Sequence, residues 1–218
     1  HLTHALTHEP ELVELSHHLP PHLDTICFLH TWLDKKKDLE KENRTIFWTN
    51  MMKLSQLTSL NIPKLKIPKY FVEWMKTGPI TDIPSLFEPE SSNWSTTLES
   101  SLPDIQNLRT IYFGSWKDIL FAPTLKKCTQ LTKLDLTIAK REVSDYVAVL
   151  GSMKALVDLR FVTNTVNIPD ELYEHHFPCL TNLEIGGMSV SHDRLPAFAN
   201  FLERHPGLTD LKVSFGED

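Results

Sequence analysis

The sequence predicts an α/β solenoid with an inner parallel β-sheet, outer helices and about nine repeats of about 26 residues. Two observations predict this fold. A motif with the spacing L-x-x-L-x-L recurs along the chain at a nearly constant interval. The segments between its copies have the length and apolar spacing of helices. A unit of this size cannot bury its own apolar face, so neighbouring units must stack, and we expect residues 1–218 to form a single domain.

The motif is clearest in the second half of the chain, where leading leucines are separated by 23, 25, 24 and 28 residues. These copies are "LRTIYF" from Leu108, "LTKLDL" from Leu131, "LVDLRF" from Leu156, "LTNLEI" from Leu180 and "LTDLKV" from Leu208. Upstream, "LDTICF" from Leu23 and "LTSLNI" from Leu57 fit equally well, and "LTHALT" from Leu2 and "ITDIPS" from Ile80 are weaker. The copies predict parallel strands at 24–28, 58–62, 109–113, 132–136, 157–161, 181–185 and 209–213. The units at Leu2 and Ile80 should be the least regular.

Three segments between strands have the apolar spacing of one-sided helices. They are "IPKYFVEWMKTG" at 67–78, "SDYVAVLGSMKA" at 144–155 and "HDRLPAFANFLERHPG" at 192–207. We expect Gly78 to end the first of them in a left-handed conformation. Ser144 is the expected N-cap of the second.

Cys128 stands three residues before a leading leucine, a position that is mostly apolar in the other repeats. Its occupants are Pro20, Leu54, Ile105, Cys128, Met153, Phe177 and His205. A buried cysteine acts as a small hydrophobe. Since no basic cluster lies near it in sequence to lower its pKa, we interpret Cys128 as structural rather than reactive.

Two stretches depart from the period, and we interpret them as irregular insertions near 30–53 and 87–97. The first contains the mixed-charge run "LDKKKDLEKENR", which predicts a longer solvated helix. The second, "FEPESSNWSTT", is rich in Pro, Ser and Glu and predicts a protruding loop. Either a partner-binding loop or a plain insertion fits it.

Composition restricts the class of function. The formal net charge of −6 argues against nucleic acid or an anionic membrane as the partner. No apolar run reaches the length of about 20 residues that spans a bilayer. Three cysteines do not make a disulfide framework, so we expect a reducing compartment, the cytoplasm or the nucleus. Because the chain begins at His1, we expect it to be a fragment or a processed product.

No catalytic arrangement is evident, and we predict a protein that is not an enzyme. The phosphate-binding, hydrolase and zinc-protease motifs are absent from the sequence, which contains only seven glycines. His4 and His8 fall on a predicted strand and its exit, where a four-residue spacing does not bring two ligands together. We therefore predict no catalytic residue, no cofactor and no metal site.

Side chains beside the second and third motif positions should point away from the core, because strand side chains alternate. The second of these positions is Asp135, Arg160, Glu184 and Lys212 in successive repeats, which predicts an ion-pair ladder across neighbouring strands. Such a ladder can keep the face soluble or can recognise a partner. The predicted protein-binding residues on this concave face are Tyr112, Lys133, Asp135, Asp158, Arg160, Asn182, Glu184, Asp210 and Lys212.

Through these motifs the whole chain resembles the leucine-rich repeat family. The C-x-x-L-x-x-L-x-L of Cys128–Leu136, with "FPCLTNLEIGG" and "FANFLERHPGLTDLKV", is similar to the repeats of fungal F-box proteins in particular. The resemblance implies the substrate-recognition repeats of a ubiquitin-ligase adaptor that binds a protein on the concave face. It implies a Skp1-type adaptor as a partner only if an F-box precedes these residues.

Two other functions fit a leucine-rich repeat chain. One is the ligand-sensing or autoinhibitory repeat domain of an innate-immune nucleotide-binding switch protein. The other, less favoured, is a Ran-type GTPase-activating protein.

Overall fold

The computed structural model describes residues 2–4, 9–28, 41–61, 67–83, 100–116, 122–138, 143–163, 168–188 and 194–215. The chain divides into two compact units, His1–Leu108 and Arg109–Asp218. Each unit has its own parallel strands and its own layer of helices. A single domain over the whole chain stays a prediction.

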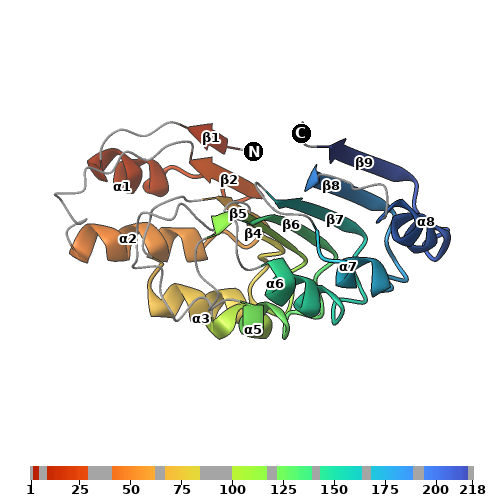
Figure 1. Cartoon of the computed structure of the whole chain (residues 1–218). Coiled ribbons are helices and arrows are strands. Elements are labelled where there is room, and N and C mark those ends of the chain that lie inside the picture. Colours follow the sequence, from red (N-terminus) through yellow and green to blue (C-terminus); the bar gives the residue numbers. More distant parts are fainter. Residues whose placement is uncertain are drawn as a thin grey trace. The chain divides into compact units, whose positions relative to one another are not determined.

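The first unit contains four short strands that pair in sequence order, all parallel. They are β1 (Leu2–His4), β2 (Thr25–Phe28), β3 (Ser59–Asn61) and β4 (Asp82–Ile83). Its helices are α1 (Glu9–His17), α2 (Lys41–Met52), α3 (Lys69–Thr77) and the 3-10 helix η1 (Leu102–Asp104). The helices alternate with the strands along the chain (Figure 1).

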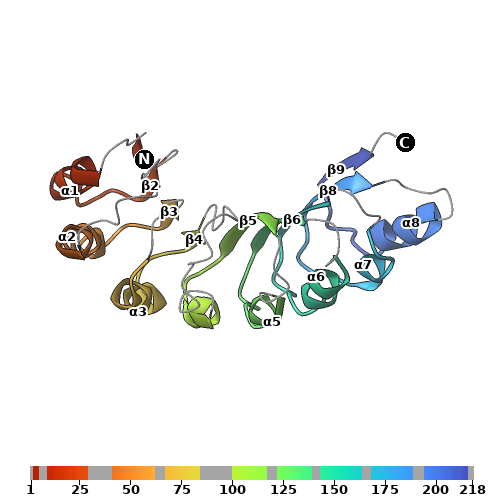
Figure 2. The same cartoon turned by 60° about the vertical axis from the view of Figure 1, so that its left-hand side comes forward.

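The second unit repeats this alternation with longer strands, again parallel and in sequence order. The strands are β5 (Thr110–Trp116), β6 (Lys133–Ile138), β7 (Asp158–Thr163), β8 (Asn182–Met188) and β9 (Asp210–Phe215). The helices are α5 (Ala122–Leu125), α6 (Val143–Leu150), α7 (Glu171–Glu174) and α8 (Leu195–Glu203). In Figure 2 these helices cover one side of the strands, and the other side carries no helix.

The predicted fold class, an α/β leucine-rich repeat solenoid with parallel strands and helices on one side, is confirmed. Each of the seven predicted strand ranges contains or overlaps an observed strand, and β3 lies entirely inside 58–62. The second motif positions align from strand to strand, with Leu134 opposite Leu159 and Leu159 opposite Leu183. As expected, the unit at Ile80 is irregular, since β4 has only two residues.

In the first repeat, the observed strand register differs from the predicted one. The motif "LTHALT" places Leu2 in the leading position, opposite Leu23. In the structure Leu2 pairs with Ile26 and therefore occupies the second motif position. The prediction was wrong by three residues because this weak copy has no second apolar residue as large as those of the others.

Backbone hydrogen bonds explain the cysteine-to-leucine spacing of the motif. The N–H of Leu131 donates to the carbonyl of Cys128 at 3.3 Å, which closes a turn. The next two N–H groups, of Thr132 and Lys133, both donate to the carbonyl of Arg109 on the preceding repeat, at 2.9 and 3.0 Å. The same turn precedes the leading residues Leu23, Leu57, Leu108, Leu156, Leu180 and Leu208. The leading leucine thus turns the chain from the helix side into the next strand.

The core lies between strands and helices and is built from the predicted positions. Leu131, Leu134, Leu136 and Cys128 are all fully buried. Of the seven residues three places before a leading residue, six are buried and Pro20 is exposed. The apolar side chains of α6 and Phe201 of α8 complete this core from the helix side.

Two helix ends differ from the predictions. Helix α6 begins at Val143, so Ser144 lies inside the first turn and is not the N-cap. Gly78 does follow α3, but its φ of −75° is not left-handed, and its N–H simply donates to the carbonyl of Trp74. Its hydrogen atom is still needed, because a Cβ there would lie 2.8 Å from that carbonyl oxygen.

The two predicted insertions have different outcomes. Residues 41–52 of the first insertion form α2, whose Phe47, Trp48 and Met51 are buried in the core. Residues 33–40 of the mixed-charge run lie outside the described residues, so the longer solvated helix stays a prediction. Residues 87–97 lie outside the described residues.

Candidate functional site

The side of β5–β9 that carries no helix (Figure 2) is here called the open face. Two rows of side chains lie on it. Strand alternation places them there, since the leucines between them point to the core. The first row is Thr110, Lys133, Asp158, Asn182 and Asp210, and the second is Tyr112, Asp135, Arg160, Glu184 and Lys212. All nine predicted binding residues, with Leu134 and Leu183, line one hollow of about 170 Å³.

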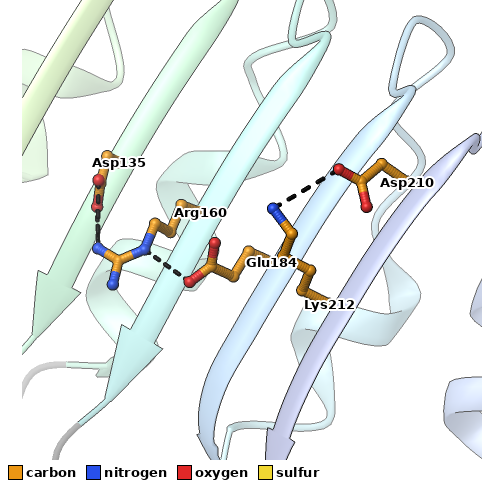
Figure 3. A network of polar contacts seen from close by, with 5 residues as sticks. All are labelled: Asp135, Arg160, Glu184, Asp210 and Lys212. Carbon is orange, nitrogen blue, oxygen red and sulfur yellow. Dashed lines mark hydrogen bonds and ion pairs between the residues drawn. The ribbon is translucent and has the colours of Figure 1, made fainter.

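Arg160 is the centre of a three-strand ion-pair network (Figure 3). Its Nη1 lies 2.9 Å from Asp135 Oδ1 on β6, and its Nε lies 2.8 Å from Glu184 Oε1 on β8. Each bond joins a charged donor to a charged acceptor, the strongest class of hydrogen bond. The bond to Glu184, with that to Asp135, raises the pKa of Arg160. The guanidinium is therefore held between two strands by fixed partners.

Asp135 is the most enclosed carboxylate of this network, with a side chain that is 19% exposed. Burial raises its pKa above the usual range, and the pairing with Arg160 offsets only part of that effect. Burial of an ionised carboxylate costs free energy unless it is paired. Arg160 thus offsets part of the cost of burying the Asp135 carboxylate in the hollow.

A second pair lies in the first row. Lys133 Nζ is 2.7 Å from Asp158 Oδ2 on the next strand, and it also stands over the Tyr112 ring at 5.7 Å from the centroid. The hydrogen bond with Asp158 raises the pKa of Lys133. The cation restrains Tyr112, which is half-buried, on the β5 side of the hollow.

The ladder predicted from the sequence ends one step early. Lys212 is in register with Glu184. Within the described residues, however, its Nζ pairs with Asp210 of its own strand, at 3.7 Å, and not with Glu184 (Figure 3). Both of these side chains are more than half exposed. Glu184 is already held by Arg160, which explains why the third step does not form.

The hollow offers hydrogen-bonding groups of both kinds. Four carboxylates and three cations surround the hollow with the amide of Asn182, so a partner meets both donors and acceptors. Within the described ranges, no three His, Cys, Asp or Glu side chains are grouped so as to hold a metal. None of the described helices has the length and apolar character needed to cross a membrane.

Sequence reasoning identified the residues of the hollow but missed two of its contacts, Lys133 with Asp158 and Lys133 with Tyr112. The signal was present, because Lys133 and Asp158 occupy the same motif position in neighbouring repeats. That these nine residues bind a protein stays a prediction.

Comparison with known proteins yields a distant structural likeness. No protein-family model matches the chain, and no curated protein matches it. Among solved structures, the chain is similar to an internalin C2 from Listeria monocytogenes, with 14% identity and a TM-score of 0.42 over 75% of this chain and 74% of that chain. The fold assignment therefore rests on the repeat period and strand register of the chain itself.

Proposed function

We propose that this protein is a non-enzymatic protein-interaction module that binds a partner on the open face of β5–β9. The observation that carries the proposal is the Asp135–Arg160–Glu184 network, whose three residues line a polar hollow. Paired, partly buried charges have lost much of their freedom before a partner arrives, which lowers the entropic cost of binding. Tyrosine and arginine, both present here, are the residue types that dominate interface hot spots.

Simple solubility is the competing explanation for this charged face. A face that only stays soluble needs scattered charges, and exposed pairs contribute about 0–1 kcal/mol each. The network instead encloses Asp135 at a cost in burial. A recognition surface accounts for that cost, because it presents a fixed pattern of charge.

Within this class we propose the finer role of substrate-recognition repeats in an F-box-type ubiquitin-ligase adaptor. Its support is the resemblance of the Cys128 repeat and of "FPCLTNLEIGG" to F-box repeats. In that role the open face binds the protein substrate, in the cytoplasm or the nucleus. A Skp1-type adaptor binds a separate F-box module.

A comparative capture experiment tests both levels. Three proteins are immobilised: the whole chain, its Arg160→Glu variant and the control variant Lys127→Glu. The proteins that each of them retains are quantified by mass spectrometry. Lys127 is an exposed residue that follows α5 and does not line the hollow. The proposal expects proteins that wild type and Lys127→Glu retain and Arg160→Glu loses. Equal retention by all three would contradict binding on the open face.

The finer role predicts a further property of the proteins that Arg160→Glu fails to retain. As substrates of a ligase they should gain ubiquitin in cells that express the full-length protein, and should gain less with the Arg160→Glu substitution. Unchanged ubiquitination would exclude the adaptor role, while the proposal of a protein-interaction module would still stand.

A further inference from the structure

Asn182 on β8 differs from the other polar residues that line the hollow. The charged side chains there are all joined in ion pairs, and Lys133 also stands over the Tyr112 ring. Within the described residues, the side-chain amide of Asn182 makes no hydrogen bond, although the residue is half-buried. Its C=O acceptor and its two N–H donors are therefore available to a ligand in the hollow.

The Arg160 guanidinium has one further available group. Its Nε and Nη1 donate to Glu184 and Asp135, whereas its Nη2 has no partner in the part of the chain that the structure describes (Figure 3). Arg160 is in register with Glu184, two residues beyond Asn182 on β8. Strands lie about 4.8 Å apart and alternate residues about 6.6 Å apart, so the Cα atoms of Arg160 and Asn182 are separated by about 8 Å. About two or three residues of extended chain cover that distance.

The ion pairs of the hollow favour an uncharged group at these two positions. A carboxylate at Nη2 of Arg160 would lie beside Asp135 and Glu184, two like charges. A cation at Asn182 would leave its two N–H donors unused, and Lys133 already occupies the neighbouring Asp158. A neutral group with one donor and one acceptor uses the Asn182 amide fully and leaves every ion pair intact. The peptide group has this composition.

A peptide group can reach Asn182 only where the backbone of the partner is not already hydrogen-bonded. In helices and inside sheets, the N–H and C=O groups bond to each other. In an extended segment, the N–H and C=O of one residue point to the same side, so a single side-chain amide can bond both. The available groups of the hollow therefore fit an unpaired, extended segment.

We propose that the partner of the open face contributes an extended backbone segment and that Asn182 is the residue that recognises it. The Asn182 amide donates to the C=O of one residue of the segment and accepts the N–H of the same residue. Nη2 of Arg160 donates to a second C=O, about two or three residues away. This role rests on the proposed function, since it names the chemistry of the partner of the open face.

A phage-displayed library of random linear peptides tests the role on the whole chain. Peptides are selected on wild type, synthesised, and titrated against wild type, Asn182→Ala, Asn182→Asp and the control Asn200→Ala. Asn200 is an exposed asparagine of α8 that does not line the hollow. The peptides should bind Asn200→Ala as tightly as wild type. They should bind Asn182→Ala and Asn182→Asp about tenfold or more weakly, because hydrogen bonds are lost.

Backbone methylation separates recognition of the backbone from recognition of side chains. The tightest peptide is synthesised with an N-methyl group at each position in turn, and each methyl group removes one N–H donor. At one position methylation should weaken binding to wild type about tenfold. The same methylation should have little further effect on Asn182→Ala, since the N–H has already lost its acceptor there. Asn182 makes no side-chain hydrogen bond, so this variant should unfold at the same denaturant concentration as wild type.

Three results would overturn the inference. The first is a library that yields no peptide whose affinity depends on Asn182. The second is a set of methylation effects that are equal on wild type and Asn182→Ala. The third is a peptide that tolerates methylation and binds through a charged side chain, which high salt would weaken. If the capture experiment still finds proteins that only Arg160→Glu loses, the protein-interaction module stands and its partner presents a folded surface instead.

Discussion

Cys128 and His205 occupy the same position of two repeats, three residues before the leading leucine, and both are buried. Cys128 is accommodated as a small apolar residue, and burial raises the pKa of its thiol to about 12. The thiol also lies 3.5 Å from the carbonyl oxygen of Thr124. His205 has two ring nitrogens that need hydrogen bonds. Its Nδ1 lies 2.6 Å from the carbonyl oxygen of Phe201, and its Nε2 accepts the N–H of Phe177 at 2.9 Å. The position is buried in both of these repeats, and the side chain determines how its polar atoms are satisfied.

The thiol of Cys128 should be inert in the folded protein. A protonated, enclosed thiol is a poor nucleophile, whereas Cys179 is exposed. Timed alkylation with iodoacetamide at neutral pH, followed by peptide mass spectrometry, should modify Cys179 first and leave Cys128 unmodified until the chain is denatured. Equal rates for the two cysteines in the folded protein would contradict the structural interpretation of Cys128.

His205 should make stability dependent on pH. Burial lowers its pKa from the usual value of 6.5, and the nearby His176 and Arg204 act in the same direction. The folded state therefore holds the neutral ring, while the unfolded chain takes up a proton below about pH 6.5. The contribution of His205 to the free energy of unfolding is complete above that pH and decreases as the pH falls below it.

The measurement for His205 is denaturant unfolding of wild type and His205→Leu from about pH 8 to pH 5. At the upper end the variant should be less stable by about 1–3 kcal/mol, because the buried N–H of Phe177 loses its acceptor. Its disadvantage should shrink as the pH falls. A difference that stays constant over the whole range would show that the ring does not remain neutral.

Within a single repeat, burial separates residues that support the fold from residues that do not. Leu134 is fully buried, and truncation to alanine should cost about 2–5 kcal/mol. Thr132, two residues earlier, makes only a long side-chain hydrogen bond, at 3.4 Å, to the carbonyl of Arg109. Thr132→Ala should leave the denaturation midpoint nearly unchanged. Similar midpoints for the two variants would mean that Leu134 is not in the core.

In the segment after α6, position 151 has no room for a side chain. A Cβ on Gly151 would lie 2.7 Å from a ring carbon of His175, and that ring is held by a 2.7 Å contact between its Nε2 and the carbonyl of Val147. Gly151→Ala should therefore destabilise the protein, by about 1–3 kcal/mol as in other overpacked sites. The double variant Gly151→Ala/His175→Ala removes the clash. If it is no more stable than Gly151→Ala, the clash is not the cause.

At the scale of elements, the sequence predicted strands better than helix ends. Strand positions follow from a motif whose leucines must reach one core, and this constraint is strong enough to locate β6 and β7. Helix ends depend on local geometry, which Ser144 and Gly78 do not determine by residue type alone. Leu2 shows the limit of the motif itself, since strand pairing places this residue opposite Ile26 despite its spacing.

At the scale of the whole molecule, the sequence predicted which residues form the candidate site but not how their charges pair. Register and alternation bring the nine predicted residues to one hollow, and both can be inferred from a repeat period. The pairing of individual charges cannot be inferred from the period, because a long side chain can reach several neighbours. Arg160 forms ion pairs with both Asp135 and Glu184, whereas Lys212 pairs with Asp210.

The central claim, that the open face binds a protein, is tested most directly by affinity and stability measured on the same variants. A partner found in the capture experiment is titrated by calorimetry against wild type, Tyr112→Ala and Lys133→Ala, two residues on the β5 side of the hollow. The account predicts that each substitution weakens binding at least about tenfold, or about 1.4 kcal/mol, while the chain stays folded. Unchanged affinity for both folded variants would contradict the account and would move the binding site to the 87–97 segment or to the helices.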